Sequence, residues 1–433
     1  MKLNTKKVND RKTHEGAVAH PINKEQELRR SVLSCMLWEG EFYESGVSIA
    51  QRISELAQQV SPAKVAKIAI EARNEMKLRH VPLLLARELA RISYSGTANL
   101  LEEIIQRPDE LTEFLTIYWK EGKCPISSQV KKGLGRAFTK FNEYSLAKYN
   151  RKETIKLRDV LFLSHAKPKD KEQEILWKKL IDDELKIPDT WEVELSASTD
   201  KKASWERLLK EDKLGALALL RNLRNMKEAD VDEELVFEAL EKMNVDRVLP
   251  FRFIAAARYA PNFEPQLESA LFKGLSEKTK WNGKTIILVD VSGSMDAPLS
   301  AKSDMTRMDA ACGLAMCCRE LCDNITVYTF SEDLVLVPSR RGFALRDAIV
   351  DSQVHWGTYL GKALEGIKEK YDRLIVITDE QSHDTVKYPK KNGYVINVAS
   401  YKSGVGYGEW VHIDGFSESI LNYIEELEKV GKD

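Results

Sequence analysis

The chain has 433 residues, of which 43% are hydrophobic and 31% charged, and its formal net charge is −1. The length predicts two or three domains rather than one core, and the near-neutral charge excludes nucleic-acid binding through a global basic field. No apolar run approaches the ~18 residues of a membrane span, and the basic N-terminus lacks the hydrophobic segment of a secretory signal. The sequence therefore predicts a cytoplasmic protein without a membrane partner.

The first part of the chain, from about Asn23 to Lys273, has the apolar spacing of helices. Ala216, Leu219, Leu220 and Leu223, for example, follow the i, i+3, i+4, i+7 pattern of one helical face. Prolines after polar residues mark helix starts along this part. Short helices in series predict an α-solenoid of helix pairs, although no repeat of fixed length is visible in the sequence.

A strongly basic segment lies within this helical part, between Lys131 and Arg158. The residues at i, i+4 and i+8 in its first half predict one charged helical stripe opposite an apolar face, and a second basic cluster follows. Such a segment is either a solvated face or a nucleic-acid surface. His165 follows it, and a lone histidine is more often structural than functional. The candidate RNA-binding residues are Lys132, Arg136, Lys140, Lys148, Arg151, Lys152 and His165.

From about Lys284 the pattern changes to alternating strands and helices, after a polar linker from Lys273 to Gly283. This alternation predicts a doubly wound, mostly parallel sheet, so the predicted domains are 1–273 and 284–433. The predicted strands are Thr285–Val291, Ile325–Phe330, Leu334–Val337, Leu374–Thr378 and Tyr394–Ala399. The predicted helices are Met305–Cys322, Ala344–Val350, Thr358–Tyr371 and about Glu418–Val430.

Cysteines concentrate in the first helix of this second part. Cys312, Cys317, Cys318 and Cys322 fall in one helical segment without the Cys-x-x-Cys pair or neighbouring histidines of a zinc site. We therefore expect buried structural thiols in a reducing compartment.

Oxygen-bearing side chains follow two of the predicted strands. Asp290, Ser292 and Ser294 succeed one another at spacings of two after the first strand, so they project to one side of an extended backbone. Thr358 precedes a helical pattern, and Asp379 ends another buried strand. Carboxylates and hydroxyls at strand ends are suitable ligands for Mg²⁺, or for another divalent cation such as Mn²⁺.

This order of strand, Asp-x-Ser-x-Ser, Thr and Asp resembles the metal-ion-dependent adhesion site of von Willebrand factor A domains. The helical part resembles the TROVE module of the Ro autoantigen family. The resemblance rests on Thr13–Gly16, Glu41–Gly46, Glu71–Arg73, Leu78–Pro82, Gly133–Ala137, Ala147–Tyr149, Arg158–His165, Ala218–Arg224 and Leu249–Phe251. A TROVE-like part followed by an A-domain is the Ro architecture.

The resemblance implies a monomeric ring of HEAT-like helical repeats closed by the A-domain. It implies binding of small noncoding Y-like RNAs on a basic outer surface, and of the single-stranded 3′ ends of misfolded RNAs in a central hole. Lys148 and His165 match family positions that contact Y RNA, and Arg136 falls in the matching basic block. An associated 3′-to-5′ exoribonuclease and a role in RNA quality control are further implications.

Two other functions remain open from the residues alone. One is a metal-dependent protein-adhesion module on a helical scaffold, which would not need the basic segment. The other is a Mg²⁺-dependent nuclease, which would usually need more carboxylates than Asp290 and Asp379. Glu380 is the one additional carboxylate, and neighbouring residues on a strand point to opposite faces. The sequence thus favours an RNA-binding scaffold that is not an enzyme.

Overall fold

The structure of the protein is a computed structural model. It describes residues 20–21, 23–33, 46–150, 154–246, 248, 250–276, 279–299, 305–399, 405–406, 409–415, 420–421, 424–425 and 428. Thr13–Gly16, Cys35, most of the Glu41–Gly46 motif, Arg151, Lys152 and most of the predicted helix Glu418–Val430 lie outside the described residues. The chain divides into two compact units, Ala50–Lys213 and the described parts of Met1–Ile49 with Leu214–Asp433, and each is described separately.

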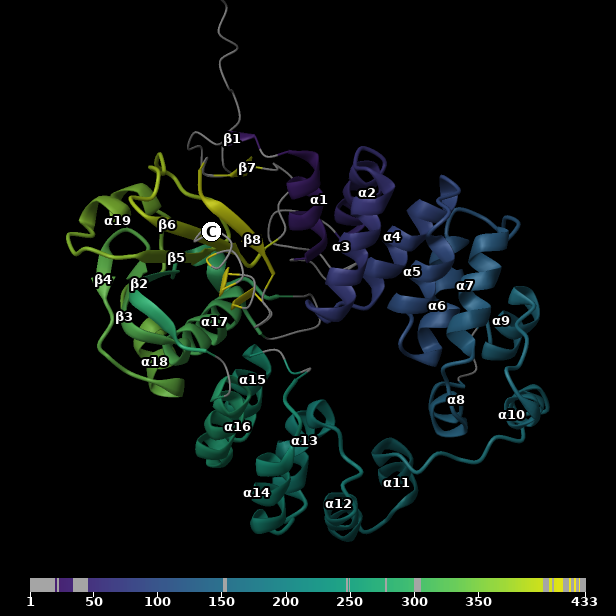
Figure 1. Ribbon diagram of the computed structural model, residues 1–433. Helices are drawn as coiled ribbons and strands as arrows, with labels where there is room; N and C mark the ends of the chain where they lie inside the picture. Colours follow the sequence, from purple (N-terminus) through teal and green to yellow (C-terminus); the bar gives the residue numbers. More distant parts are fainter. Residues whose placement is uncertain are drawn as a thin grey trace, which may run out of the picture. The chain divides into compact units, whose positions relative to one another are not determined.

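The unit from Ala50 to Lys213 is built of helices in two layers (Figure 1). Contacts between every second helix along the chain join α3, α5, α7 and α9 into one layer and α4, α6 and α8 into another, and α3 also packs closely against α4. This is the arrangement of helix pairs that the apolar spacing predicts. The helices are α2 (Gly46–Ala57), α3 (Pro62–Asn74), α4 (His80–Arg91), α5 (Thr97–Ile104), α6 (Pro108–Tyr118), α7 (Ser128–Phe138), α8 (Glu143–Tyr149), α9 (Leu157–Ser164), α10 (Lys171–Ile181), α11 (Trp191–Ala197) and α12 (Lys201–Lys210).

Polar residues begin these helices, as expected. Asp170 accepts a hydrogen bond from the backbone of Gln173 at 2.8 Å and so caps α10, and Ser127 accepts one from Val130 in α7. At α6 the carboxylate of Glu110 accepts the backbone N–H groups of Gln106 and Arg107. These bonds satisfy donors that a helix start would otherwise leave unpaired.

The second unit contains further helices in two layers and a six-stranded sheet. The helices α13 (Ala216–Glu228) and α15 (Phe251–Tyr259) pack together, as do α14 (Glu233–Lys242) and α16 (Glu264–Ser276). Helix α1 (Lys24–Leu33) and a short pairing of β1 (His20–Pro21) with β7 (Val405–Gly406) also belong to this unit. None of the helices among the described residues is both long and apolar enough to cross a membrane.

The sheet has the order β4-β3-β2-β5-β6-β8, with β4 antiparallel and the other strands parallel. Its central strands are β2 (Trp281–Asp290), β5 (Arg373–Thr378) and β6 (Asn392–Asn397). These strands are apolar runs because both faces of the sheet are covered. The remaining strands are β3 (Cys322–Phe330), β4 (Leu334–Leu336) and β8 (Val411–Asp414), of which β8 was not predicted.

Helices cover the two faces of the sheet. On one face Leu360, Ala363 and Ile367 form a core with strand residues that include Ile286 and Val376. Leu360 and Ala363 belong to α19 (Leu360–Gly366), and Ile367 directly follows this helix. Helix α17 (Arg307–Leu321) packs on β2, β3 and β5, and α18 (Gly342–Val350) packs on α17. The four cysteines predicted to be structural are buried, as expected.

Two predicted segments are wrong at both ends. The linker Lys273–Gly283 is shorter, because α16 continues to Ser276 and β2 begins at Trp281. The helix predicted for Thr358–Tyr371 is only α19, because hydrogen bonds hold the backbone of Thr358 in a loop and the helix ends at Gly366. The helical pattern still gives way to alternating strands and helices where expected, and the domain assignment 1–273 and 284–433 stays a prediction.

Candidate functional sites

The ends of β2 and β5 bring Asp290 and Asp379 to the point where the strand order reverses. Strand β2 lies between β3 and β5, so the chain leaves β2 toward one edge of the sheet and later continues toward the other. Val289 is paired with Ile377, which places Asp290 beside Thr378. The Thr378 hydroxyl donates a hydrogen bond to Asp290 Oδ2 at 2.5 Å. Open α/β sheets bind ligands at such a point.

The Asp-x-Ser-x-Ser loop folds back on its own aspartate. The backbone N–H of Ser292 donates to Asp290 Oδ1 at 2.9 Å, and the hydroxyl oxygens of Ser292 and Ser294 lie 3.3 Å apart. Asp290 and Ser292 are buried. The side chains at spacings of two therefore do lie on one side of the loop, as predicted.

Backbone hydrogen bonds tie the loop of Thr358 to the loops of both carboxylates. Gly293 N donates to Trp356 O at 2.9 Å, and His383 N donates to Thr358 O at 2.7 Å. A Cβ atom at Gly293 would lie 3.3 Å from the carbonyl oxygen of His355, so a glycine suits this close approach. Thr358 itself is buried. The structure thus brings together the three loops that carry all five predicted metal-binding residues.

The electrostatics of this centre suit a cation. Burial and the charge of Asp379 raise the pKa of Asp290 to about 7. Asp379 Oδ2 lies 3.2 Å from the guanidinium of Arg307, and both side chains are fully buried. Two buried carboxylates with three hydroxyls are oxygen donors that fit a hard divalent cation, which would offset the repulsion between the carboxylates. Arg307 was not anticipated, because nothing in the pattern of α17 indicates that its first residue faces the sheet ends.

Glu380 turns away from this centre. Its carboxylate pairs with His412 on β8, with 2.6 Å between Oε1 and Nδ1. The backbone φ of Glu380 is 59°, a left-handed conformation two residues after the end of β5. Among the described residues, no group of three or more His, Cys, Asp or Glu side chains is placed to hold a metal ion.

The basic stripe predicted for α7 is only partly a free surface. Lys132 is exposed, whereas Arg136 Nη1 donates to Asn99 Oδ1 at 2.9 Å and pairs with Glu102 at 3.3 Å. Lys140 lies beyond the end of α7, so the predicted three-residue helical stripe is wrong at its last member. Its ammonium donates to the carbonyls of Glu102 and Ile105 at the end of α5, and burial lowers the pKa of Lys140.

The next two helices carry the remaining described candidates. Lys148 in α8 is half-buried, and its Nζ lies 5.9 Å from the centre of the Tyr149 ring. Arg107 lies over the same ring at 4.6 Å. His165 is exposed and ends α9 with a left-handed backbone, φ 53°. It lines a shallow cavity of about 700 Å³ together with Lys167, Lys178 and exposed apolar side chains.

Two glycines position α7 between its neighbours. A Cβ atom at Gly133 would lie 2.9 Å from the carbonyl oxygen of Ala98 in α5. A Cβ atom at Gly135 would lie 3.4 Å from Ala166, the residue after His165. The apolar face predicted opposite the basic residues consists of Leu134, Ala137, Phe138 and Phe141, and all four are buried, although Phe141 lies beyond the end of α7. Close packing therefore holds Arg136 and His165 on adjoining helices.

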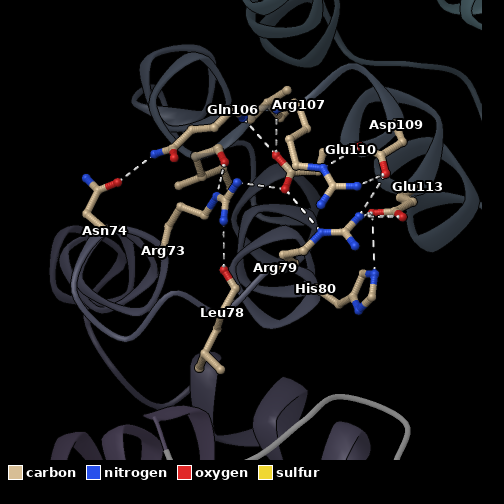
Figure 2. Close-up of polar contacts among 12 residues, drawn as sticks. Arg73, Asn74, Leu78, Arg79, His80, Gln106, Arg107, Asp109, Glu110 and Glu113 are labelled. Atoms are coloured by element: carbon tan, nitrogen blue, oxygen red, sulfur yellow. Dashed lines mark hydrogen bonds and ion pairs between the residues drawn. The ribbon is translucent and has the colours of Figure 1, made fainter. Parts of the chain in front are cut away.

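A network of charged side chains links α3, α4 and α6 (Figure 2). Arg73 pairs with the fully buried Glu110 at 2.7 Å and donates to the carbonyl of Ile104 at 2.9 Å. Arg79 pairs with Asp109, Glu110 and Glu113. The Glu71–Arg73 and Leu78–Pro82 segments, which the family resemblance singled out, thus supply the cations of a structural network.

Comparisons with known proteins agree with the sequence resemblance. The family model described as the TROVE domain matches residues 182–309. Telomerase protein component 1 of Mus musculus is 41% identical over 91 residues, and that of Rattus norvegicus is 38% identical over 91 residues. Each alignment covers 20% of this chain and 4% of the relative's length.

A solved structure extends the likeness to most of the chain. It is the crystal structure of the Deinococcus radiodurans RO (RSR) protein, which matches 92% of this chain and 98% of its own with a TM-score of 0.61. The sequence identity is 17%, so this match concerns the fold.

Proposed function

The chain is a TROVE-domain protein with the fold of a Ro protein, and from this premise we propose that it binds noncoding RNA. Its ligands are small structured RNAs of the Y-like kind and the single-stranded 3′ ends of misfolded RNAs. The protein acts in the cytoplasm in RNA quality control, with an exoribonuclease as partner, and has no catalytic activity itself.

One observation carries this proposal. The cations of Lys132 and Lys148 and the imidazole of His165 are placed on α7, α8 and at the end of α9, within one closely packed helical unit. Lysine side chains on a rigid surface bind the phosphates of structured RNA, which is recognised by shape and backbone. Arg136 and Lys140 support the same surface through their contacts with α5.

For the A-domain we propose a bound Mg²⁺ or Mn²⁺. Ser292, Ser294 and Thr358 would hold it directly, and Asp290 and Asp379 directly or through water. The bound cation would supply a coordination position for a carboxylate of a protein partner. The two carboxylates in this centre, with Glu380 engaged by His412, are fewer than a two-metal nuclease would use.

The test is RNA binding measured by filter retention over a series of salt concentrations. Lys132→Ala, Lys148→Ala and His165→Ala are compared with wild type, using a structured small RNA. Loss of each contact should weaken RNA binding by about 1 kcal/mol or more. Each lysine variant should also reduce, by about one, the slope of the logarithm of the binding constant against the logarithm of the salt concentration. Lys210→Ala, an exposed lysine on α12, is the matched control.

Asp290→Ala should leave the RNA affinity unchanged, since the metal would serve a different ligand. If the wild-type affinity does not depend on salt, or if Lys210→Ala weakens binding as much as the three other variants, the metal-dependent adhesion scaffold becomes the better explanation.

A further inference from the structure

A cavity of about 340 Å³ lies between α13 and α15, in the unit that also contains the sheet. Arg221, Arg224 and Asn225 of α13 line one side. Arg252 and Tyr259 of α15 line another. The described residues that line this cavity include no aspartate or glutamate. Three guanidinium groups therefore converge on one hollow without an acidic wall, an arrangement that favours an anionic ligand.

The charges in this cavity are not balanced within the described protein. Among the described residues neither Arg221 nor Arg252 forms an ion pair, and burial together with the charge of Arg221 lowers the pKa of Arg252. Arg224 pairs with Glu228 one helical turn away at 3.3 Å. Arg252 is partly buried, and such charges usually have partners, so an anion would relieve the repulsion between Arg252 and the exposed Arg221.

Helix α15 carries two arginines with different contacts, Arg252 at the cavity and Arg258 at α17. Arg258 pairs with Asp309 of α17 at 2.7 Å and so fixes α15. A Cβ atom at Gly313 of α17 would lie 3.1 Å from Phe251 N, which shows how closely these helices approach. Arg252 takes no part in this contact, and its guanidinium remains at the cavity.

An aromatic side chain stands beside the arginines. Tyr259 is 47% exposed and lies with its ring centre 5.8 Å from the guanidinium of Arg224. Planar guanidinium groups bind phosphate through paired hydrogen bonds, and exposed tyrosine rings stack on nucleobases. We propose that this cavity binds the phosphate group of a nucleotide, with Arg221 and Arg252 on the phosphate and the Tyr259 ring against the base.

This inference concerns helices other than α7 to α9, and where the phosphate belongs to a single strand it rests on the proposed binding of single-stranded 3′ ends. The phosphate has two possible sources, a free nucleotide or a nucleotide within a single strand. The full chain is therefore titrated with inorganic phosphate, with adenosine monophosphate and with a single-stranded oligonucleotide, and binding is followed by calorimetry.

The variants are Arg221→Gln with Arg252→Gln, Arg221→Gln alone and Tyr259→Ala. Lys227→Gln is the matched control, because it removes one exposed charge from α13 outside the cavity. The double variant should weaken nucleotide binding at least tenfold and Lys227→Gln less than twofold. Tyr259→Ala should weaken binding of adenosine monophosphate but not of inorganic phosphate. Thermal melting checks folding, and Arg221→Gln alone serves if the double variant does not fold, since Arg221 is exposed.

Tighter binding of the oligonucleotide than of adenosine monophosphate would identify the strand as the source, and equal binding would identify the free nucleotide. The proposal is overturned if wild type binds none of the three probes, or if Arg221→Gln and Lys227→Gln have the same effect on all of them. Structured-RNA binding through Lys132 and Lys148 is measured in parallel. If the cavity proposal is overturned and wild type still binds structured RNA, only the cavity assignment has failed and the proposed function stands.

Discussion

Arg307 and Asp379 form an ion pair at 3.2 Å with both side chains fully buried. The pair connects the first residue of α17 with the end of β5, so the helix after the Asp-x-Ser-x-Ser loop holds one of the two carboxylates of the candidate centre. Removal of one partner of a buried pair leaves an uncompensated charge.

The pair predicts a metal-dependent stability. Arg307→Met should lower the free energy of unfolding by about 3–5 kcal/mol in a chelator, because Asp379 remains buried without its cation. Added Mg²⁺ should restore part of this loss if it binds the same centre. Urea unfolding of wild type, Arg307→Met and Arg307→Lys, each with EDTA and with Mg²⁺, measures both effects. An equal loss with and without Mg²⁺ would contradict the link between Arg307 and the metal.

The candidate metal centre predicts modest but specific Mn²⁺ binding. Asp290→Asn with Asp379→Asn should abolish the binding, because no charged ligand remains in the centre. Glu380→Gln is the control, since its carboxylate pairs with His412 instead. Titration calorimetry of the full chain gives the comparison. Unchanged Mn²⁺ binding in the double variant would show that these oxygens form no site.

The two glycines of α7 predict opposite effects of the same substitution. Gly133→Ala should lower the free energy of unfolding by about 1–3 kcal/mol. The added Cβ would lie 2.9 Å from the backbone carbonyl oxygen of Ala98, which cannot easily move. Gly135→Ala should be neutral or stabilising by up to about 1 kcal/mol, since its Cβ meets ordinary contacts and alanine favours a helix. Chemical unfolding of both variants tests the pair. Equal effects would mean that α5 and α7 do not approach as closely as described.

The charged network of α3, α4 and α6 predicts a pH dependence. Although burial opposes ionisation, the hydrogen bond from His80 and the charge of Arg79 lower the pKa of Glu113. Its contribution to stability is therefore present above the unfolded pKa of about 4.3 and lost as the pH falls through the lower folded value. Glu113→Gln should lower the melting temperature at pH 7, and the difference from wild type should shrink below about pH 4.

Glu184→Gln, which changes an exposed glutamate in the same unit, should have little effect at either pH. A difference between wild type and Glu113→Gln that stays constant down to pH 3 would exclude the ionised carboxylate as its cause.

Much of the fold and part of the candidate metal centre were predictable, because the signals are local. The apolar run before Asp290 indicates a strand covered on both faces, and the oxygens at spacings of two lie on one side of the loop, as expected. Helix starts with capping residues such as Asp170 depend on the same short-range hydrogen bonds. Local periodicity and capping chemistry need only neighbouring residues, so the sequence by itself determined the helical character of the first part and most strands and helices of the second, but not β8.

The partners of the charged residues depended on the tertiary structure. Lys132 and Lys140 have the same charge and are both exposed, yet the ammonium of Lys140 binds the carbonyls at the end of α5. Arg307 reaches Asp379 across 72 positions of the chain, and Arg221 meets Arg252 only because α13 packs on α15. Charge and spacing are equally compatible with solvent, an ion pair or a ligand. Only the packing of helices and strands decides which groups a long side chain can reach, and so which arginines hold the fold together and which line a cavity.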